Sequence, residues 1–300
     1  MQAIEEWRRR GRTVDTPDGR VWAVEVGQEK GGDAPVLVLH GFPTSSWDFG
    51  PAIERVSQTR RVVAFDFLGY GLSDKPREFA ASLFEQADVA ELVARAFGIT
   101  RAHVWAHDMG TSVATELCAR RERGLLSFAM ESLVLMNGSV HIELAHLTLG
   151  QQVLKSRLGP IFARLNTKLS FKAQMRRVFA RPPSEAELDA MWALVAREDG
   201  TALMPALIRY TEERARFRRR WIGALERLDL PAFVAWGARD PVAVLPIADA
   251  LAREIPGCER VTWEDLGHYP QVEDPERVAR ALIGFWDRLA SARGAHAPFA

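Results

Sequence analysis

The hydrophobic pattern of the first half of the chain alternates between strand-like and helix-like segments. Unbroken apolar runs occur at residues 35–41, 61–69, 103–108 and 132–138. Runs without polar alternation are typical of strands that are covered on both faces of a parallel sheet. Helical periodicity lies between them at residues 84–98 and 109–122. The segments that flank PDGR predict a β-hairpin at residues 12–26.

The pattern changes after Gly138. Residues 139–229 contain helical stretches and no strand-like run, and one of these stretches, 183–198, has Ser184 and Glu187 at the spacing of a capping box. Strand-like runs return at 231–240 and 260–268, and a last helix is predicted at 275–289. We therefore predict an α/β fold with a mostly parallel, doubly wound sheet. Its core comprises 1–138 and 230–300, and 139–229 form an all-helical cap inserted after the sixth strand.

Composition and charge exclude several classes of protein. The chain has 39 basic and 39 acidic residues, so no global charge favours nucleic acid. No run approaches the ~20 apolar residues of a membrane span, and the N-terminus lacks the apolar stretch of a secretory signal. Cys118 and Cys258 match no metal-ligand spacing and are expected to be reduced thiols. We expect a cytoplasmic protein without a metal or cofactor.

The predicted cap differs from the core in charge. Residues 139–229 hold 16 Lys or Arg and 10 Asp or Glu, and the densest basic stretch is ERARFRRRW at 213–221. One interpretation is a solvated helix face that forms salt bridges with the acidic core. The other is attraction to an anionic surface or substrate, since clustered like charges create a local field.

Three residues with catalytic chemistry each follow a predicted strand. Asp108 follows the run HVWAH, Asp240 ends WGARD, and His268 ends LGH. The carboxyl ends of parallel strands meet at one edge of the sheet, where ligand and catalytic groups gather. The order nucleophile, acid, histidine predicts a catalytic triad. The alternative for Asp108 is that it only caps the helix that follows.

A possible oxyanion hole completes this arrangement. The turn HGFP can direct the backbone N–H of Phe42 into the site, beside that of Met109, and two converging donors stabilise an oxyanion. Gly110 occupies the last position of the G-x-nucleophile-x-G pattern, whereas Ala106 replaces its first glycine.

An aspartate nucleophile selects the substrate class. Serine that attacks a saturated carbon would leave a stable ether, but a carboxylate leaves an ester. His268, oriented by Asp240, can activate water to cleave that ester. The sequence therefore predicts attack at sp³ carbon, with epoxides or alkyl halides as substrates and water as the second reactant.

Four motifs carry a family resemblance: HGFP, AHDMG, WGARDP and GHYPQVEDPE. With them the chain resembles the epoxide hydrolase and haloalkane dehalogenase branch of the α/β-hydrolase superfamily over nearly its whole length. The resemblance implies an α/β-hydrolase fold whose helical cap is a lid over the site. In this family halide is released to a Trp after the nucleophile and to an Asn or second Trp. Met109 and Phe42 occupy two of these places, so epoxide hydrolysis is favoured.

The resemblance also implies a cap tyrosine that donates to the epoxide oxygen, and Tyr210 matches such a position. The alternative is that Tyr210 has only a structural role and packs on a cap helix. The usual second cap tyrosine is missing, and His146 is a candidate replacement, although a structural or surface histidine is favoured. We further expect a substrate pocket formed by His40, Trp47, His107, His146 and Tyr269.

Two alternatives to epoxide hydrolysis stay open. One is a haloalkane or haloacid dehalogenase. Fluoroacetate dehalogenases carry arginines near the nucleophile, and Met109 and Ser112 stand in those places. The other is a non-catalytic or receptor-like protein that keeps the fold and uses the triad region as a ligand pocket.

Overall fold

A single eight-stranded sheet forms the centre of the molecule. The computed structural model describes residues 2–29, 32–78 and 80–295. The strands are β1 (Gly11–Thr16), β2 (Gly19–Val26), β3 (Val36–Leu39), β4 (Val62–Phe65), β5 (Arg101–His107), β6 (Ala129–Met136), β7 (Ala232–Gly237) and β8 (Glu259–Trp263). They are ordered β1-β2-β4-β3-β5-β6-β7-β8, and only the β1–β2 and β2–β4 pairs are antiparallel. Each strand overlaps a run predicted from the sequence.

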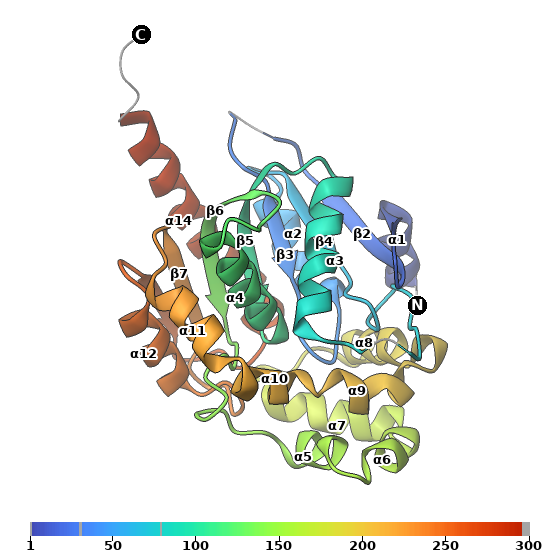
Figure 1. The fold of residues 1–300 in the computed structure, drawn as a ribbon. Helices are drawn as coiled ribbons and strands as arrows, with labels where there is room; N and C mark the ends of the chain where they lie inside the picture. Colours follow the sequence, from blue (N-terminus) through green and yellow to red (C-terminus); the bar gives the residue numbers. More distant parts are fainter. Residues whose placement is uncertain (1, 30–31, 79, 296–300) are drawn as a thin grey trace.

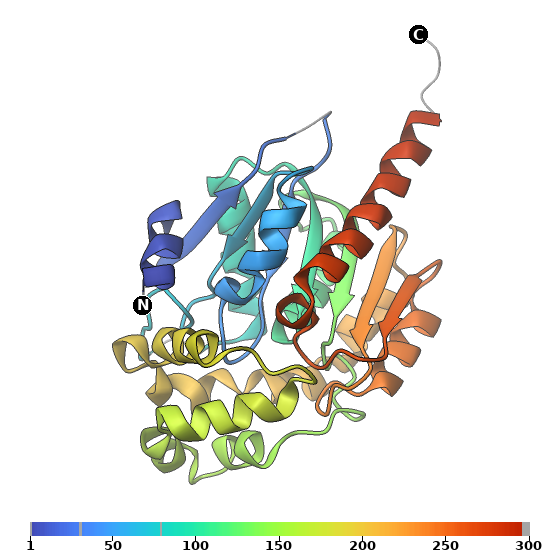
Figure 2. The ribbon, with the colours of Figure 1, turned by 180° about the vertical axis from the view of Figure 1, so that it is seen from behind.

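Helices cover both faces of this sheet, as a doubly wound fold requires (Figures 1 and 2). Helices α3 (Leu83–Ala96), α4 (Met109–Glu122) and α11 (Arg218–Glu226) lie on one face, and α2 (Gly50–Val56) and α14 (Pro275–Ala295) lie on the other. The remaining helices of the core are α1 (Gln2–Arg10), the short 3-10 helix η1 (Ser46–Phe49), α12 (Leu245–Glu254) and α13 (Pro270–Glu273). The hydrophobic pattern did not predict α1, which is short and buries only Ile4 and Trp7.

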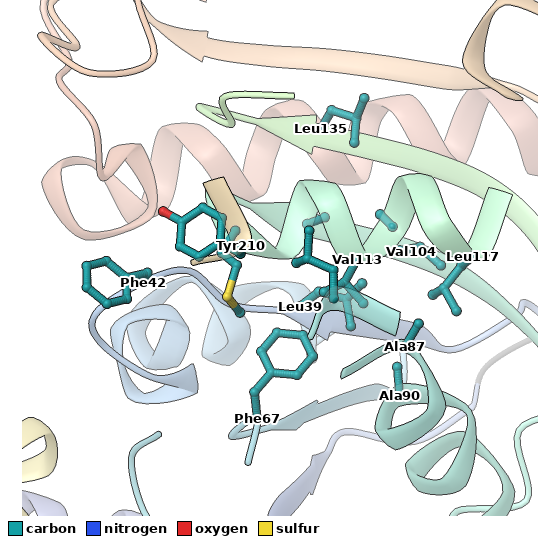
Figure 3. Packing of buried hydrophobic residues seen from close by; sticks show 14 of the residues in the cluster. Leu39, Phe42, Phe67, Ala87, Ala90, Val104, Val113, Leu117, Leu135 and Tyr210 are labelled. Atoms are coloured by element: carbon teal, nitrogen blue, oxygen red, sulfur yellow. The ribbon is translucent and has the colours of Figure 1, made fainter. Parts of the chain in front are cut away.

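The two-sided burial explains the unbroken apolar runs. In β5, Val104 and Ala106 pack in the hydrophobic cluster that includes α3 and α4, whereas Trp105 packs in the cluster on the opposite face. Figure 3 shows part of the first cluster, with Val104 beside Val113 of α4. Because both faces of the strand are dry, every position along it favours an apolar side chain.

The segment after β6 is helical, and we refer to its helices as the cap. Its elements are α5 (Leu149–Lys155), α6 (Gly159–Leu165), α7 (Lys168–Val178), α8 (Glu185–Ala196), η2 (Arg197–Leu203), α9 (Met204–Leu207) and α10 (Tyr210–Arg216). The structure assigns no strand within 139–229. The capping box of Ser184 and Glu187 is present at the start of α8. Figures 1 and 2 show these helices together at one end of the sheet.

Helix α11 lies at the end of the predicted insertion and packs against α4 of the core. The buried carboxylate of Glu116 on α4 accepts hydrogen bonds from Arg220 at 2.7 and 2.8 Å and from the Trp221 indole at 2.9 Å. Arg227 of the same region pairs with Glu122. These contacts agree with the interpretation that basic residues of 139–229 form salt bridges with the core. Cys118 and Cys258 are both free thiols.

Candidate active site

Asp108 occupies a sharp turn between β5 and α4. Its backbone has φ 47° and ψ −114°, an unfavourable conformation for a side chain other than glycine, and the residue is buried. The turn needs glycine nearby, because a Cβ on Gly110 would lie 2.2 Å from the Leu39 carbonyl oxygen. A Cβ on Gly41 would lie 2.6 Å from Cβ of Asp108. Ala106 is accommodated as a buried residue of β5.

One of the two predicted oxyanion donors contacts the carboxylate. The backbone N–H of Phe42 donates to Oδ2 of Asp108 at 2.8 Å. Within the described residues, no hydrogen bond joins the Met109 amide to this carboxylate. The side chain of Met109 instead accepts from the Tyr70 hydroxyl at 3.1 Å. Met109 as the second donor therefore remains a prediction.

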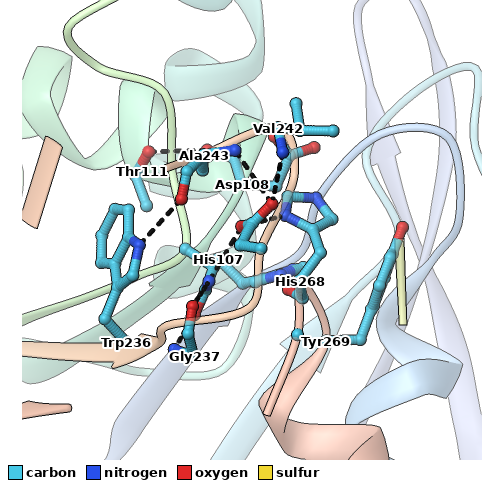
Figure 4. Close-up of polar contacts among 12 residues, drawn as sticks. His107, Asp108, Thr111, Trp236, Gly237, Val242, Ala243, His268 and Tyr269 are labelled. Carbon is cyan, nitrogen blue, oxygen red and sulfur yellow. Dashed lines mark hydrogen bonds and ion pairs between the residues drawn. The ribbon is translucent and has the colours of Figure 1, made fainter. Parts of the chain in front are cut away.

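The predicted acid and histidine are in direct contact. Nδ1 of His268 and Oδ2 of Asp240 lie 2.6 Å apart. The other oxygen of Asp240 accepts from the amides of Val242 and Ala243 (Figure 4), and the Asn137 side chain donates to Oδ2 at 2.8 Å. Burial alone would lower the pKa of His268, but the charge and hydrogen bond of Asp240 raise it above the ordinary value. Nδ1–H therefore donates to Asp240, and Nε2 is left to accept a proton.

Two of the predicted pocket histidines support the backbone of the site. Burial lowers the pKa of His107 far below its usual value, so the ring is neutral. Its Nε2–H can then donate to the His268 carbonyl oxygen at 2.7 Å. His40 is also buried, with a lowered pKa. Its Nε2 accepts from the Phe67 amide at 2.9 Å, while Nδ1 lies 2.9 Å from the Gly41 carbonyl oxygen.

A pocket of about 150 Å³ opens at His268 between core and cap. Its lining is mostly apolar and comes from the core residues Phe42, Pro43, Val242, His268 and Tyr269 and from cap residues of α5, α7 and α9. Of the five predicted pocket residues, the structure places Tyr269 in this lining. His40 and His107 are fully buried and are not part of the lining, and Trp47 borders a separate groove beside Trp7. The side chain of His146 is exposed.

Tyrosines surround Asp108. The chain has three, Tyr70, Tyr210 and Tyr269, and all are buried. Burial raises the pKa of each phenol, and the nearby charge of Asp108 raises it further. The rings of Tyr210 and Phe42 are 5.9 Å apart, and they lie at the same end of the cluster in Figure 3. Tyr70 lies in the loop after β4 and was not predicted from the sequence to be near the site.

A buried arginine near Asp108 was also not predicted from the sequence. Arg214 of α10 is 1% exposed and donates through Nε to Ser112 Oγ at 2.6 Å and through Nη2 to the Asp108 carbonyl oxygen at 3.1 Å. Nη2 lies 4.0 Å from Oδ1 of Asp108, and Cζ lies 4.5 Å from the centre of the Tyr210 ring. Its spacing of four residues from Tyr210 places both on one helix face. The sequence does not distinguish Arg214 from the neighbouring arginines of this segment, so its burial could not be predicted.

The described residues contain no group of three or more His, Cys, Asp or Glu arranged to hold a metal ion. Within the same part of the chain, no helix is both long enough and apolar enough to cross a membrane.

Known proteins resemble this chain in sequence and in fold. The family described as alpha/beta hydrolase fold matches residues 34–275. LipZ of Mycobacterium tuberculosis, which is provisionally named a hydrolase, is 42% identical over 284 residues, covering 94% of this chain and 97% of LipZ. A haloalkane dehalogenase from Bradyrhizobium elkanii superposes with a TM-score of 0.77 at 23% identity, covering 95% of this chain and 98% of that one.

A further relative is the mesoderm-specific transcript homolog protein of Bos taurus. It is 35% identical over 293 residues, covering 94% of this chain and 88% of the bovine protein. The stretches HGFPTSSWDF and DFLGYGLSDKPR predict this likeness, and the identity confirms it. The fold, the family match and these identities agree, and the chain belongs to the alpha/beta hydrolase fold family.

Proposed function

We propose that this protein is a hydrolase that opens epoxides to vicinal diols through a covalent ester on Asp108. The observation that carries the proposal is the position of the Asp108 carboxylate, which sits on the nucleophile turn with Oδ2 bound to the Phe42 amide. Because Oδ2 is held there, Oδ1 is the oxygen that attacks. A carboxylate in this position forms an ester with a saturated carbon, and water can cleave that ester.

In the first step, Oδ1 of Asp108 bonds to an epoxide carbon, and the carbon–oxygen bond of the ring breaks. The ring oxygen takes a proton from a tyrosine hydroxyl, for which Tyr210 of the cap is the candidate because its ring packs against Phe42, whose amide binds Asp108. The two other tyrosine hydroxyls have neighbours in the core. Tyr70 donates to Met109 Sδ, and Tyr269 Oη lies 3.4 Å from Thr44 Oγ1.

In the second step, neutral His268 takes a proton from water at Nε2, and the resulting hydroxide attacks Cγ of the ester. The Phe42 amide stabilises the oxyanion at Oδ2, and Asp240 stabilises the imidazolium. Collapse restores the Asp108 carboxylate and releases the diol, and the imidazolium returns a proton to the phenolate. The sum is one epoxide and one water converted to one diol.

Arg214 supports a second candidate, haloacid dehalogenation. Fluoroacetate dehalogenases carry arginines near the nucleophile. In this chain Ser112 occupies one of the positions that hold an arginine in those enzymes. Arg214 of the cap donates to Ser112 Oγ, and its guanidinium lies near Asp108. The cap therefore supplies a buried arginine where the sequence around the nucleophile has none. That cation would suit a substrate carboxylate.

A trapped intermediate tests these proposals. In His268→Gln the first step can still run, but ester hydrolysis should stall. We expect intact-protein mass spectrometry to show an adduct equal to the full mass of styrene oxide, on the peptide that contains Asp108. The matched control is Asp108→Asn combined with His268→Gln, which should form no adduct.

Other outcomes reassign the protein. A bromide such as 1-bromohexane would leave only its alkyl part, and an alkyl adduct without an epoxide adduct would indicate a haloalkane dehalogenase. A carboxymethyl adduct from fluoroacetate would indicate a haloacid dehalogenase. If no probe forms an adduct with the folded variant and the wild-type protein turns over none of them, a non-catalytic role is favoured.

A further inference from the structure

The outer helices of the cap expose large apolar side chains. We define the cap patch as Leu149, Leu158, Ile161, Leu165 and Leu169, whose exposed fractions are 59–78%. Only one other large hydrophobic residue among those described, Leu125, is comparably exposed, and it lies between α4 and β6. Scattered exposed leucines are ordinary, but five within 21 residues on consecutive helices indicate an interaction surface.

The segment that carries the cap patch is strongly basic. Residues 149–178 contain seven Lys or Arg and no Asp or Glu. Three of these cations, Lys168, Lys172 and Arg176, pair with carboxylates of α8. Among the described residues, no ion pair is found for the other four, which are Lys155, Arg157, Arg164 and Arg177. These cations without an ion-pair partner therefore lie on, or between, the same three helices that carry the apolar side chains.

The cap patch also lies beside the pocket. Helices α5, α6 and α7 are the lowest elements in both Figure 1 and Figure 2, on the side of the cap that is turned away from the sheet. Leu149 belongs to the patch and also to the pocket lining, together with Leu154 and Met175. A surface that contacts the patch would therefore lie at the entrance of the pocket.

We propose that the cap patch docks on an anionic lipid surface. Exposed leucines can enter the boundary between headgroups and acyl chains, while lysines and arginines around them bind anionic headgroups. Association of two copies through this face would bring their positive charges together, and this repulsion disfavours a dimer. Docking would place the entrance at Leu149 against the lipid, so an apolar compound dissolved there could reach the pocket. This proposal does not depend on the reaction at Asp108.

Vesicle sedimentation of the full chain tests the proposal. The probes are vesicles of phosphatidylcholine alone and vesicles with equal parts of phosphatidylcholine and phosphatidylglycerol. We expect the wild-type protein to sediment with the mixed vesicles and to remain unbound with phosphatidylcholine alone. Binding should weaken as salt is raised, because the electrostatic part is screened. A wild-type protein that binds neither type overturns the proposal.

Matched variants locate the contact. Leu158→Asp with Leu165→Asp should reduce vesicle binding roughly tenfold or more, since apolar insertion is lost and negative charge is added. Arg157→Glu with Arg164→Glu should act in the same direction. Leu125→Asp is the control, because its exposure is similar but it lies outside the cap patch. Equal loss in that control, or a dimer in light scattering that only the patch variants dissociate, would overturn the proposal.

Discussion

The core side and the cap side of the candidate active site are built in different ways. On the core side, Asp240 is held largely by its own loop, because Oδ1 accepts from the amides two and three residues later. On the cap side, Arg214 is held by partners about a hundred residues away, at Asp108 and Ser112. Local contacts therefore hold one oxygen of Asp240, although its other oxygen is bound by the distant Asn137 and His268. The position of Arg214 depends entirely on how the cap packs on the core.

The largest expected effect comes from the core side. Asp108→Ala should fold normally and lose essentially all turnover, because the turn between β5 and α4 then carries no carboxylate. Steady-state rates together with circular dichroism would check this. A folded variant with a substantial fraction of wild-type activity would contradict the proposed mechanism.

Asp240→Asn tests the partner of the histidine. The amide cannot stabilise the imidazolium and can favour the wrong tautomer, and comparable replacements in serine hydrolases lower kcat by about 10⁴. We expect a loss smaller than that of Asp108→Ala, because Asp240 makes no bond to substrate. An Asp240→Asn enzyme as fast as wild type at saturating substrate would refute the assignment.

The cap side is tested by Tyr210→Phe. If Tyr210 donates to the epoxide oxygen, the variant should open epoxides ~10²–10⁴ more slowly, as is typical when general-acid catalysis is lost. Tyr70→Phe is the matched control, since Tyr70 is equally buried but donates to Met109 Sδ. Single-turnover rates should separate the two variants, and equal losses would argue against a special role for Tyr210.

The smallest expected effect is a shift in pH dependence. His268 must be neutral to activate water, and its pKa is raised above the ordinary value mainly through Asp240. Ester hydrolysis should therefore slow as pH falls through that raised pKa, and half of the maximal rate should occur above pH 6.5. In Asp240→Asn, the residual activity should fall at a lower pH than in the wild-type protein. If the activity falls at an unchanged pH, the group that titrates is not His268 paired with Asp240.

The difference between the core side and the cap side also explains which site residues could be predicted from the sequence. Asp108, Asp240 and His268 follow strands that an apolar run identifies, so their meeting follows from parallel topology alone. The roles of His40 and His107 were less accessible, because their partners are backbone groups of distant loops. Arg214 and Tyr70 were missed for a related reason. Nothing in a run of arginines shows which one turns inward, and a loop tyrosine carries no periodic signal.

The position of the tyrosines gives the protein an internal spectroscopic reporter. All three in the chain lie around Asp108, and there is none elsewhere. Biosynthetic replacement of tyrosine by 3-fluorotyrosine would consequently introduce fluorine only at this site. A ¹⁹F NMR spectrum should then contain three resonances, each assignable from one Tyr→Phe variant, and all of them would report on ligand binding or ester formation.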